Sequence, residues 1–352
     1  FPEEGRSLGA GEKIDFTNYG AKAGATLKVT GRHLFDLNAG YQTKAPNIRN
    51  SYANARLNND IGMGLTDETI QNVDLSYIYR SPIVKARLTG YYVGFEDQTD
   101  IGFFFTQNAI GAENNNAFVQ EIVTGIDKRN VGLEMGFEAQ VTPTIKLKAA
   151  AAYGQYIYTN NPDLYLAGDD FDDPSTAIVE GNDLYSRGVR EVALKNYHVS
   201  GGPEQAYQLG FEYRDPDFWW VGMSTNYFSN AYVDVSNLRR TEDFTQDEDG
   251  ITFNDYDPEV ARDLLRQEQL DDYFLVNVIG GKSWKVDDYF VGFFATINNV
   301  LGEEYKTGGF EDSRRASYRQ QVEESNRETP VFGNRYFFGN GTTYYVNVYV
   351  RF

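Results

Sequence analysis

A strict alternation of apolar and polar residues, held over unusually long spans, constrains this sequence most. The closing stretch places large apolar side chains at every second position: Tyr344, Val346, Val348, Val350 and Phe352. Residues 17–30 alternate in the same way, and a period of two predicts β-strand. A tilted strand needs roughly 9–11 residues to cross a bilayer, whereas strands of soluble sheets usually have about 5 or 6. These spans therefore have membrane-crossing length.

The same unit recurs as pairs of strands joined by turns of a few Gly, Pro and Asp residues. The five predicted hairpins pair residues 17–30 with 35–42, 73–79 with a strand that begins at 84–88, 131–141 with 145–153, 207–213 with 219–223, and 273–285 with 289–301. Between hairpins the sequence predicts long polar connections of roughly 25 to 50 residues. With the closing strand, the prediction is eleven strands.

Short turns at one rim and long loops at the other are typical of outer-membrane barrels, whose turns face the periplasm and whose loops face outward. In a compact soluble domain, structureless loops of this length would count against the strand assignments. A bacterial single-chain barrel has an even number of strands. The predicted eleven are therefore incomplete, and eleven more would give about 22, the size of outer-membrane transporters with a plugged lumen.

Composition supports an all-β fold and excludes a helical membrane protein. The 352 residues include 26 Tyr, 24 Phe and 34 Gly, a composition typical of large β proteins with aromatic girdles. No apolar run reaches the roughly 18 residues of a transmembrane helix. The mean hydropathy of -0.52 does not exclude a barrel, because only every second strand residue faces lipid.

Charge and cysteine content narrow the function classes. The net charge of -19 disfavours nucleic acid as a partner. The absence of cysteine excludes disulfides, thiolate metal sites and a cysteine nucleophile. Residues 1–12 are polar and contain no signal-peptide core, so we expect the numbering to begin inside a longer protein.

An acidic stretch, residues 242–272, carries twelve acidic and two basic residues. Its carboxylates include candidate ligands for a structural calcium ion: Asp247, Asp249, Asp255 and Asp257. The spacing does not match a helix-loop-helix calcium site, since Thr252 stands where the Gly of that loop is needed. A solvated acidic loop is the alternative interpretation, and Pro258–Leu270 is predicted to contain a short surface helix.

The last long loop, residues 302–340, combines arginines with aromatic residues. The candidate ligand-binding residues are Arg314, Arg315, Tyr318, Arg319, Arg335 and Tyr336. Guanidinium groups and rings could bind an anion or a sugar by forked hydrogen bonds and stacking. Seven acidic residues share the loop, so internal ion pairing is the alternative.

No arrangement of nucleophile and base stands out, and an enzyme is not expected. The two histidines, His33 and His198, lie far apart in the sequence without partners at metal-ligand spacing. We expect both to be structural. No organic cofactor is expected either.

Four segments, in order along the chain, resemble the TonB-dependent outer-membrane receptors. The segment Ile297–Tyr305 (INNVLGEEY) resembles the signature Asn-Leu-Phe-Asp-x-x-Tyr, with Val-Leu-Gly in place of Leu-Phe-Asp. Gly40–Asn47 (GYQTKAPN) resembles an Arg-x-Pro segment, with Lys44 in place of the Arg. Gly201–Pro203 and the terminal Tyr349–Phe352 resemble two further segments. The long Tyr- and Asn-bearing loops look most like receptors of the Bacteroidota type.

The resemblance implies a domain assignment and a set of partners. Residues 1–352 would be one C-terminal part of a transmembrane antiparallel barrel, inserted in outer-membrane lipid of a bacterium. The rest of the barrel, the N-terminal plug and the contact with TonB would belong to sequence outside these residues. A surface lipoprotein lid often accompanies such receptors.

Three functional interpretations follow. The first is active uptake of a ligand, such as a glycan, a peptide or a siderophore, powered through TonB. The second is a receptor-like barrel that serves as a scaffold in a larger outer-membrane complex. The third, a soluble adhesin-like β-sandwich, predicts extraction without detergent.

Overall fold

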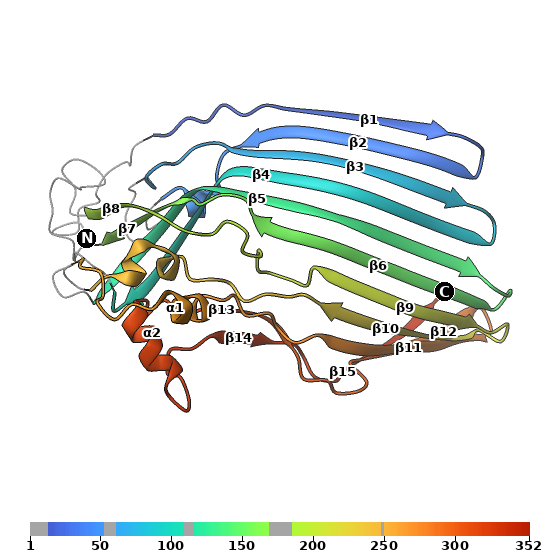
Figure 1. The fold of residues 1–352 in the computed structure, drawn as a ribbon. Coiled ribbons are helices and arrows are strands. Elements are labelled where there is room, and N and C mark those ends of the chain that lie inside the picture. The colour runs from blue at the N-terminus through green and yellow to red at the C-terminus, as the bar shows by residue number, and fades with distance from the viewer. Residues whose placement is uncertain (1–12, 53–60, 109–115, 169–184, 248–249) are drawn as a thin grey trace, which may run out of the picture.

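The computed structural model describes residues 13–52, 61–108, 116–168, 185–247 and 250–352. Its main feature is a curved sheet in which eleven strands follow one another, each antiparallel to its neighbours (Figure 1). The strands are β1 (Gly20–Lys28), β2 (His33–Lys44), β3 (Glu68–Arg80), β4 (Val84–Thr106), β5 (Ala117–Gln140), β6 (Ile145–Tyr158), β9 (Gln205–Arg214), β10 (Trp219–Ser229), β11 (Tyr273–Val286), β12 (Tyr289–Asn298) and β15 (Thr343–Arg351). The eleven predicted strands are confirmed.

The sheet is open. Strand β1 pairs only with β2, and β15 pairs only with β12, so each leaves one edge without a partner strand in the described part of the chain. Tight turns join the strands at one end, and all long connections lie at the other (Figure 1). We call these the turn end and the loop end. The predicted asymmetry of the connections is confirmed.

The register of the strands gathers apolar side chains on one face. Leu75 pairs with Leu37 on one side and Gly90 on the other, and Phe211 pairs with Leu147 and Met223. Exposed members of this face include Leu88, Leu133, Met135, Phe137, Leu209, Phe293, Val346, Val348 and Val350. Apolar surface of this extent, on a chain that is otherwise strongly charged, is expected where lipid replaces water.

The opposite face is polar and concave. Two hollows lie on it, one lined by Asn38, Asp74 and Arg87, the other by Gln208 and Asn277. We call this the inner face and the apolar one the outer face. The alternation of the sequence thus corresponds to an apolar exterior and a wet interior, as in a barrel.

The connection between the second and third hairpins is shorter than the predicted 25 to 50 residues, because β4 continues to Thr106 and β5 begins at Ala117. The pairing of the two strands shifts between Phe95 and Asp100, where Asp97 and Gly125 adopt positive φ angles of 58° and 71°. Beyond this irregularity β5 is covered on both faces around Ile122 and Val123, which are almost fully buried. A strand buried on both faces loses the alternation of period two, so the sequence signal is missing.

The loop end folds into a packed unit on those halves of β4 and β5 that lie nearest to it. Its remaining elements are β7 (Asp163–Gly168), β8 (Tyr185–Glu191), β13 (Lys306–Phe310), β14 (Arg335–Phe338), α1 (Pro258–Leu264), α2 (Tyr318–Ser325) and the short 3-10 helices η2 (Ile48–Asn50), η4 (Leu238–Arg240) and η5 (Glu242–Thr245). β7 pairs with β5, and β8 pairs with β7. No helix in the described part of the chain is long and apolar enough to cross a bilayer.

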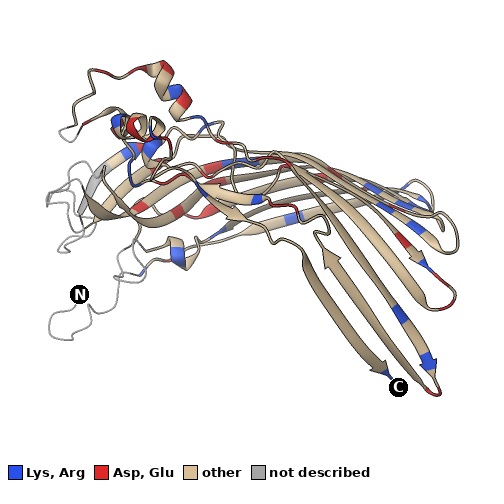
Figure 2. Cartoon of the chain, turned by 90° about the horizontal axis from the view of Figure 1, so that it is seen from below, with Lys and Arg blue, Asp and Glu red and all other residues tan. Residues whose placement is uncertain are grey.

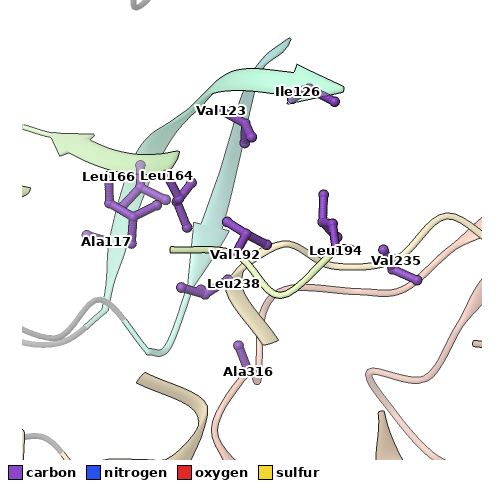
Figure 3. Packing of buried hydrophobic residues seen from close by; sticks show 11 residues of the cluster. Ala117, Val123, Ile126, Leu164, Leu166, Val192, Leu194, Val235, Leu238 and Ala316 are labelled. Atoms are coloured by element: carbon purple, nitrogen blue, oxygen red, sulfur yellow. The ribbon is translucent and has the colours of Figure 1, made fainter. Parts of the chain in front are cut away.

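The buried core of the protein lies in this unit. Figure 3 shows side chains of β5, β7 and three connecting segments meeting around Leu164, Val192 and Leu238, each of which is fully buried. A second cluster joins Phe244, Phe253 and Tyr318. Each full burial of such a side chain contributes about 1.5–3 kcal/mol. The described parts of the long connections are therefore folded structure.

The predicted surface helix is confirmed, with a different end. α1 begins at Pro258 and is capped by the Asp257 carboxylate, which accepts hydrogen bonds from the backbone amides of Glu259 and Val260. It ends at Leu264, and Leu270 is buried against Ala231 and Val233 in a separate cluster.

Candidate functional site

The inner face of β2–β6 and β9 is rich in charge, and we call it the charged inner wall. Its charged residues include Asp36, Asp74, Arg87, Glu134, Glu138, Lys146, Lys148 and Glu212. Some of them pair with one another: Lys148 Nζ lies 3.1 Å from Glu212 Oε2, and Lys146 Nζ lies 3.5 Å from Glu138 Oε1. The wall thus presents fixed charges of both signs to the lumen.

Arg87 is bound to hydroxyl groups on this wall. Its Nε donates to Ser76 Oγ at 3.2 Å and to Thr89 Oγ1 at 3.1 Å, and the two hydroxyls are joined at 2.9 Å. Asp74 accepts a hydrogen bond of 3.1 Å from the Asn38 amide. Among the described residues, Arg87, Asp74 and Glu134 take part in no ion pair. Their charges face the concavity.

The inner face of β10, β11, β12 and β15 differs, and we call it the uncharged inner wall. All residues of these strands are described, and at inner-face positions Asp, Glu, Lys, Arg and His are absent except at the turn end, where Lys285 and Arg351 lie. The inner-face residues include Ser224, Asn226, Asn277, Ser283, Phe294, Thr296, Tyr345, Asn347 and Tyr349. In Figure 2, β15 is almost free of charged residues up to its C-terminal tip.

Amides and hydroxyls on the uncharged inner wall bond to one another and to neighbouring segments. The Asn347 amide donates to the Tyr345 hydroxyl at 3.3 Å, and Asn277 Oδ1 accepts from the backbone of Asn299 at 2.9 Å. Across the boundary with the charged inner wall, the Gln208 amide donates to Asn226 Oδ1 at 3.0 Å. The Tyr349 and Ser283 hydroxyls lie 2.6 Å apart. Such a surface can exchange hydrogen bonds with water or with a polar ligand at small net cost.

The predicted arginines of the last loop are engaged within the protein. Arg315 donates to Glu324 at 2.6 Å and also pairs with Glu323. Arg319 Nε donates to both oxygens of Asp255, at 2.8 and 3.1 Å. Tyr318, only 5 % exposed, belongs to a buried cluster. The internal ion pairing considered as the alternative is present at Arg315 and Arg319.

The other three candidates lie in the same unit. The Arg314 guanidinium lies over the rings of Phe105 and Phe332, at 4.6 and 5.2 Å from their centres. Arg335 donates to the backbone oxygen of Val331 at 3.0 Å. As ligand-binding residues, all six remain a prediction, and at these positions the side chains already have partners.

Tyr336 forms a small polar group with its neighbours. Its hydroxyl donates to Glu268 at 2.8 Å, and Lys306 Nζ lies 3.7 Å from the centre of its ring. Burial, and then the hydrogen bond to the Glu268 carboxylate, raises the pKa of Tyr336 to about 12. The hydroxyl therefore stays protonated at neutral pH and acts as a donor.

Sequence reasoning missed the ion pair that joins two outer loops. Arg240, 4 % exposed, binds both carboxylate oxygens of Glu311, which is 6 % exposed; one of these bonds measures 2.8 Å. Arg240 also donates to the backbone oxygen of Leu265 at 3.0 Å and lies 4.9 Å from the centre of the Tyr197 ring. The two residues are 71 positions apart, so no local pattern indicates the pair.

The candidate calcium ligands do not converge where the structure describes them. Asp255 binds Arg319, Asp257 caps α1, and Asp247 accepts a hydrogen bond from the backbone of Ile251 at 2.9 Å. Asp249 lies outside the described residues. Among the described residues, no group of three or more His, Cys, Asp or Glu side chains is placed to hold a metal ion. A calcium ion in this loop stays a prediction.

Each histidine has a structural partner. His198 Nδ1 lies 2.8 Å from Glu204 Oε1, and its ring stacks on Tyr232 with centres 3.8 Å apart. His33 Nδ1 lies 2.8 Å from the Tyr77 hydroxyl. These contacts fit the structural role expected for both residues.

The geometry can be compared with known structures. The sequence matches no protein-family model and no curated protein sequence. Among solved structures, the copper transporter OprC superposes with a TM-score of 0.52 at 13 % identity, over 93 % of this chain and 38 % of that one. A mutant of the ferric enterobactin receptor PfeA of Pseudomonas aeruginosa superposes with a TM-score of 0.51 at 12 % identity, over 94 % of this chain and 40 % of that one. Both are TonB-dependent outer-membrane receptors.

The chain has the fold of part of a TonB-dependent receptor barrel. A third similar structure, the outer-membrane ferripyoverdine receptor of Pseudomonas aeruginosa, superposes with a TM-score of 0.50 at 10 % identity and is covered over 32 % of its length. The chain thus spans only about a third to two fifths of these receptors, in line with the two free edges of its sheet. The similar structures are transporters and receptors, not enzymes.

Proposed function

We propose that the chain forms the C-terminal part of an outer-membrane receptor that takes up a ligand with energy supplied through TonB. The observation that carries this proposal is the pairing of an apolar outer face with a polar concave inner face, below a packed unit of outer loops. An apolar exterior suits a bilayer, and a polar lumen suits a path for a polar ligand. The receptor-barrel fold supports the same function.

The free edges of the sheet require further strands. A strand edge in lipid leaves backbone N–H and C=O groups without partners, at several kcal/mol each. Successive antiparallel strands alternate in direction, so the first and eleventh strands run the same way. Two copies of this sheet that cross the membrane in the same orientation therefore cannot close a barrel by antiparallel pairing. We propose that strands of the same protein outside these residues complete it, with a plug inside and TonB as the periplasmic partner.

The ligand class is open to a direct test. The similar structures are named for copper, ferric enterobactin and ferripyoverdine. For this chain we retain glycans, peptides and siderophores as candidates, and propose that a lipoprotein lid of the Bacteroidota type assists at the loop end.

The test compares a deletion of the whole gene with a loss of TonB function in the native bacterium. Ferric siderophores, oligopeptides and oligosaccharides are offered one at a time as the sole iron, amino-acid or carbon source. We expect one source for which both strains fail to grow, with growth restored by the intact gene in the first. A deletion that alters the protein composition of an outer-membrane complex, without a growth defect shared with TonB loss, would instead favour the scaffold.

A further inference from the structure

The inner face of the sheet divides lengthwise into two walls of different chemistry. The charged inner wall covers β2–β6 and β9, and the uncharged inner wall covers β10, β11, β12 and β15. The boundary is sharp, because Glu212 on β9 pairs with Gly222 on β10, the next strand. If a plug inside the barrel bound equally to all parts of the inner face, we would not expect the charged residues to be confined to one wall.

We propose that the charged inner wall holds the plug of the receptor, and that ligand passes between the plug and the uncharged inner wall. The proposal rests on the proposed function and adds the side on which the path opens. Its basis is the difference in how strongly the two walls can bind a protein segment inside the barrel.

Fixed charges make the charged inner wall a strong docking surface. Asp74, Arg87 and Glu134 face the same hollow, and none of them has an ion-pair partner among the described residues. A plug segment with complementary charges pairs with them and excludes water where it packs against the wall. Charge pairs covered in this way are costly to separate, because each partner loses its counter-charge.

The uncharged inner wall is built for weaker contact. Several of its amides and hydroxyls already bond within the wall, as Asn347 does to Tyr345 and Ser283 to Tyr349, so they do not depend on a plug for partners. A force applied to the plug therefore separates it from this wall first, and a ligand in the gap meets mainly amides, hydroxyls and rings. Fixed charge reaches this gap only at the boundary, where the paired Lys148 and Glu212 line the same hollow as Ser224.

Thiol labelling of single cysteines tests which wall becomes accessible. Ser224→Cys reports on the uncharged inner wall and Ala150→Cys on the charged one. Ser224 pairs with Gly210 on β9, and Ala150 pairs with Gln208 on the same strand. These two partners are only two residues apart, so Ser224 and Ala150 lie at similar depths in the barrel wall. Thr225→Cys on the outer face is the lipid-facing control. The full-length receptor is expressed in its native outer membrane, and a charged maleimide that does not cross lipid is added outside, with and without a protonophore.

We expect energised cells to label Ser224→Cys several-fold faster than de-energised cells, with Ala150→Cys unchanged and Thr225→Cys unlabelled. Equal acceleration at both inner positions, or a faster reaction at Ala150→Cys, would overturn the proposed path while leaving energised uptake intact. No acceleration at either inner position would contradict the proposed function as well. A second pair, Thr296→Cys and Ala152→Cys, guards against a local folding defect and must give the same ordering.

Discussion

At the scale of single residues, the long-range contacts of the outer loops decide how the loop end is built. The Arg240–Glu311 pair connects the segment after β10 to the segment after β13, and both side chains are almost completely buried. Burying two charges is expensive, and attraction offsets that cost only when the geometry and the other hydrogen bonds are good. Here both Glu311 oxygens accept hydrogen bonds from Arg240, and the Leu265 carbonyl oxygen accepts a further hydrogen bond from the same guanidinium.

Arg240→Ala is therefore expected to loosen the outer loops. It leaves the Glu311 carboxylate buried without its main partner, a change that typically costs about 3–5 kcal/mol. The matched control is Arg266→Ala, which removes an exposed pair with Asp263, 2.6 Å long, that contributes little in water. Limited proteolysis of the detergent-solubilised receptor should cut the outer loops of the first variant much faster. Equal cleavage of both variants would show that the buried pair does not hold the loops.

The close approach of β11 and β12 at Gly281 leads to a second prediction for single residues. A Cβ on Gly281 would lie 2.5 Å from the Phe293 backbone oxygen, whereas one on Gly136 would meet nothing within 4 Å, although both glycines are on the inner face. Gly281→Val should lower the free energy of unfolding by about 1–3 kcal/mol through overpacking, and Gly136→Val should be close to neutral. Urea titration in detergent measures both. The prediction is contradicted if the two variants unfold at the same urea concentration.

At the scale of elements, the sequence predicts the strands that repeat a local alternation of apolar and polar residues, and it misses elements that lack such a pattern. All eleven barrel strands follow from the alternation, because each has one lipid face and one wet face. The loop-end half of β5 was missed because burial on both faces around Ile122 and Val123 removes that alternation. In β4 the three consecutive phenylalanines at 103–105 interrupt it. α1 was found from its proline start. α2 was missed, because the helix that follows the capping residue Ser317 has few apolar residues and no apolar periodicity that stands out.

The candidate site divides in the same way. The inner-face polarity was readable from the sequence, but the contrast between the two walls required the strand order and register. The partners of Arg315 and Arg319 depend on the placement of α2 beside the acidic segment, which no spacing in the sequence specifies.

Helix α2 should be sensitive to acid. Hydrogen bonds from Arg315, then Arg327, lower the pKa of Glu323 to about 2. Burial raises the pKa of Glu324, but hydrogen bonds from Arg315 and from the backbone of Phe332 and Val331 outweigh it, and the net shift is downward. A lowered pKa in the folded state stabilises the fold above the ordinary pKa, and this contribution is lost as the pH falls.

We therefore expect the docking of α2 to be intact above pH 4.5 and to weaken as the pH falls from about 4.5 towards about 2. Hydrogen-exchange protection of residues 318–332, corrected for the intrinsic rate at each pH, reports this change. Glu324→Gln should lower protection at pH 6 and flatten its dependence on pH. Protection of the unaltered helix that stays constant down to pH 3 would contradict the assignment.

At the scale of the whole molecule, the structure is a wall with two environments. Lipid on the outer face and water or protein on the inner face account for the alternation, for the free edges and for the concentration of the buried core at the loop end. The uptake proposal and the division of the inner face into two walls both depend on this orientation.

A nitroxide scan of β12 tests the orientation most directly. Single spin labels at residues 290–297 of the full-length receptor, reconstituted in lipid bilayers, are exposed to oxygen and to a water-soluble nickel chelate. Val291, Phe293, Ala295 and Ile297 should show high collision rates with oxygen, and the positions between them should not. A uniform profile along the strand, or high oxygen accessibility at Phe290, Gly292, Phe294 and Thr296 instead, would contradict the orientation of the wall in the membrane.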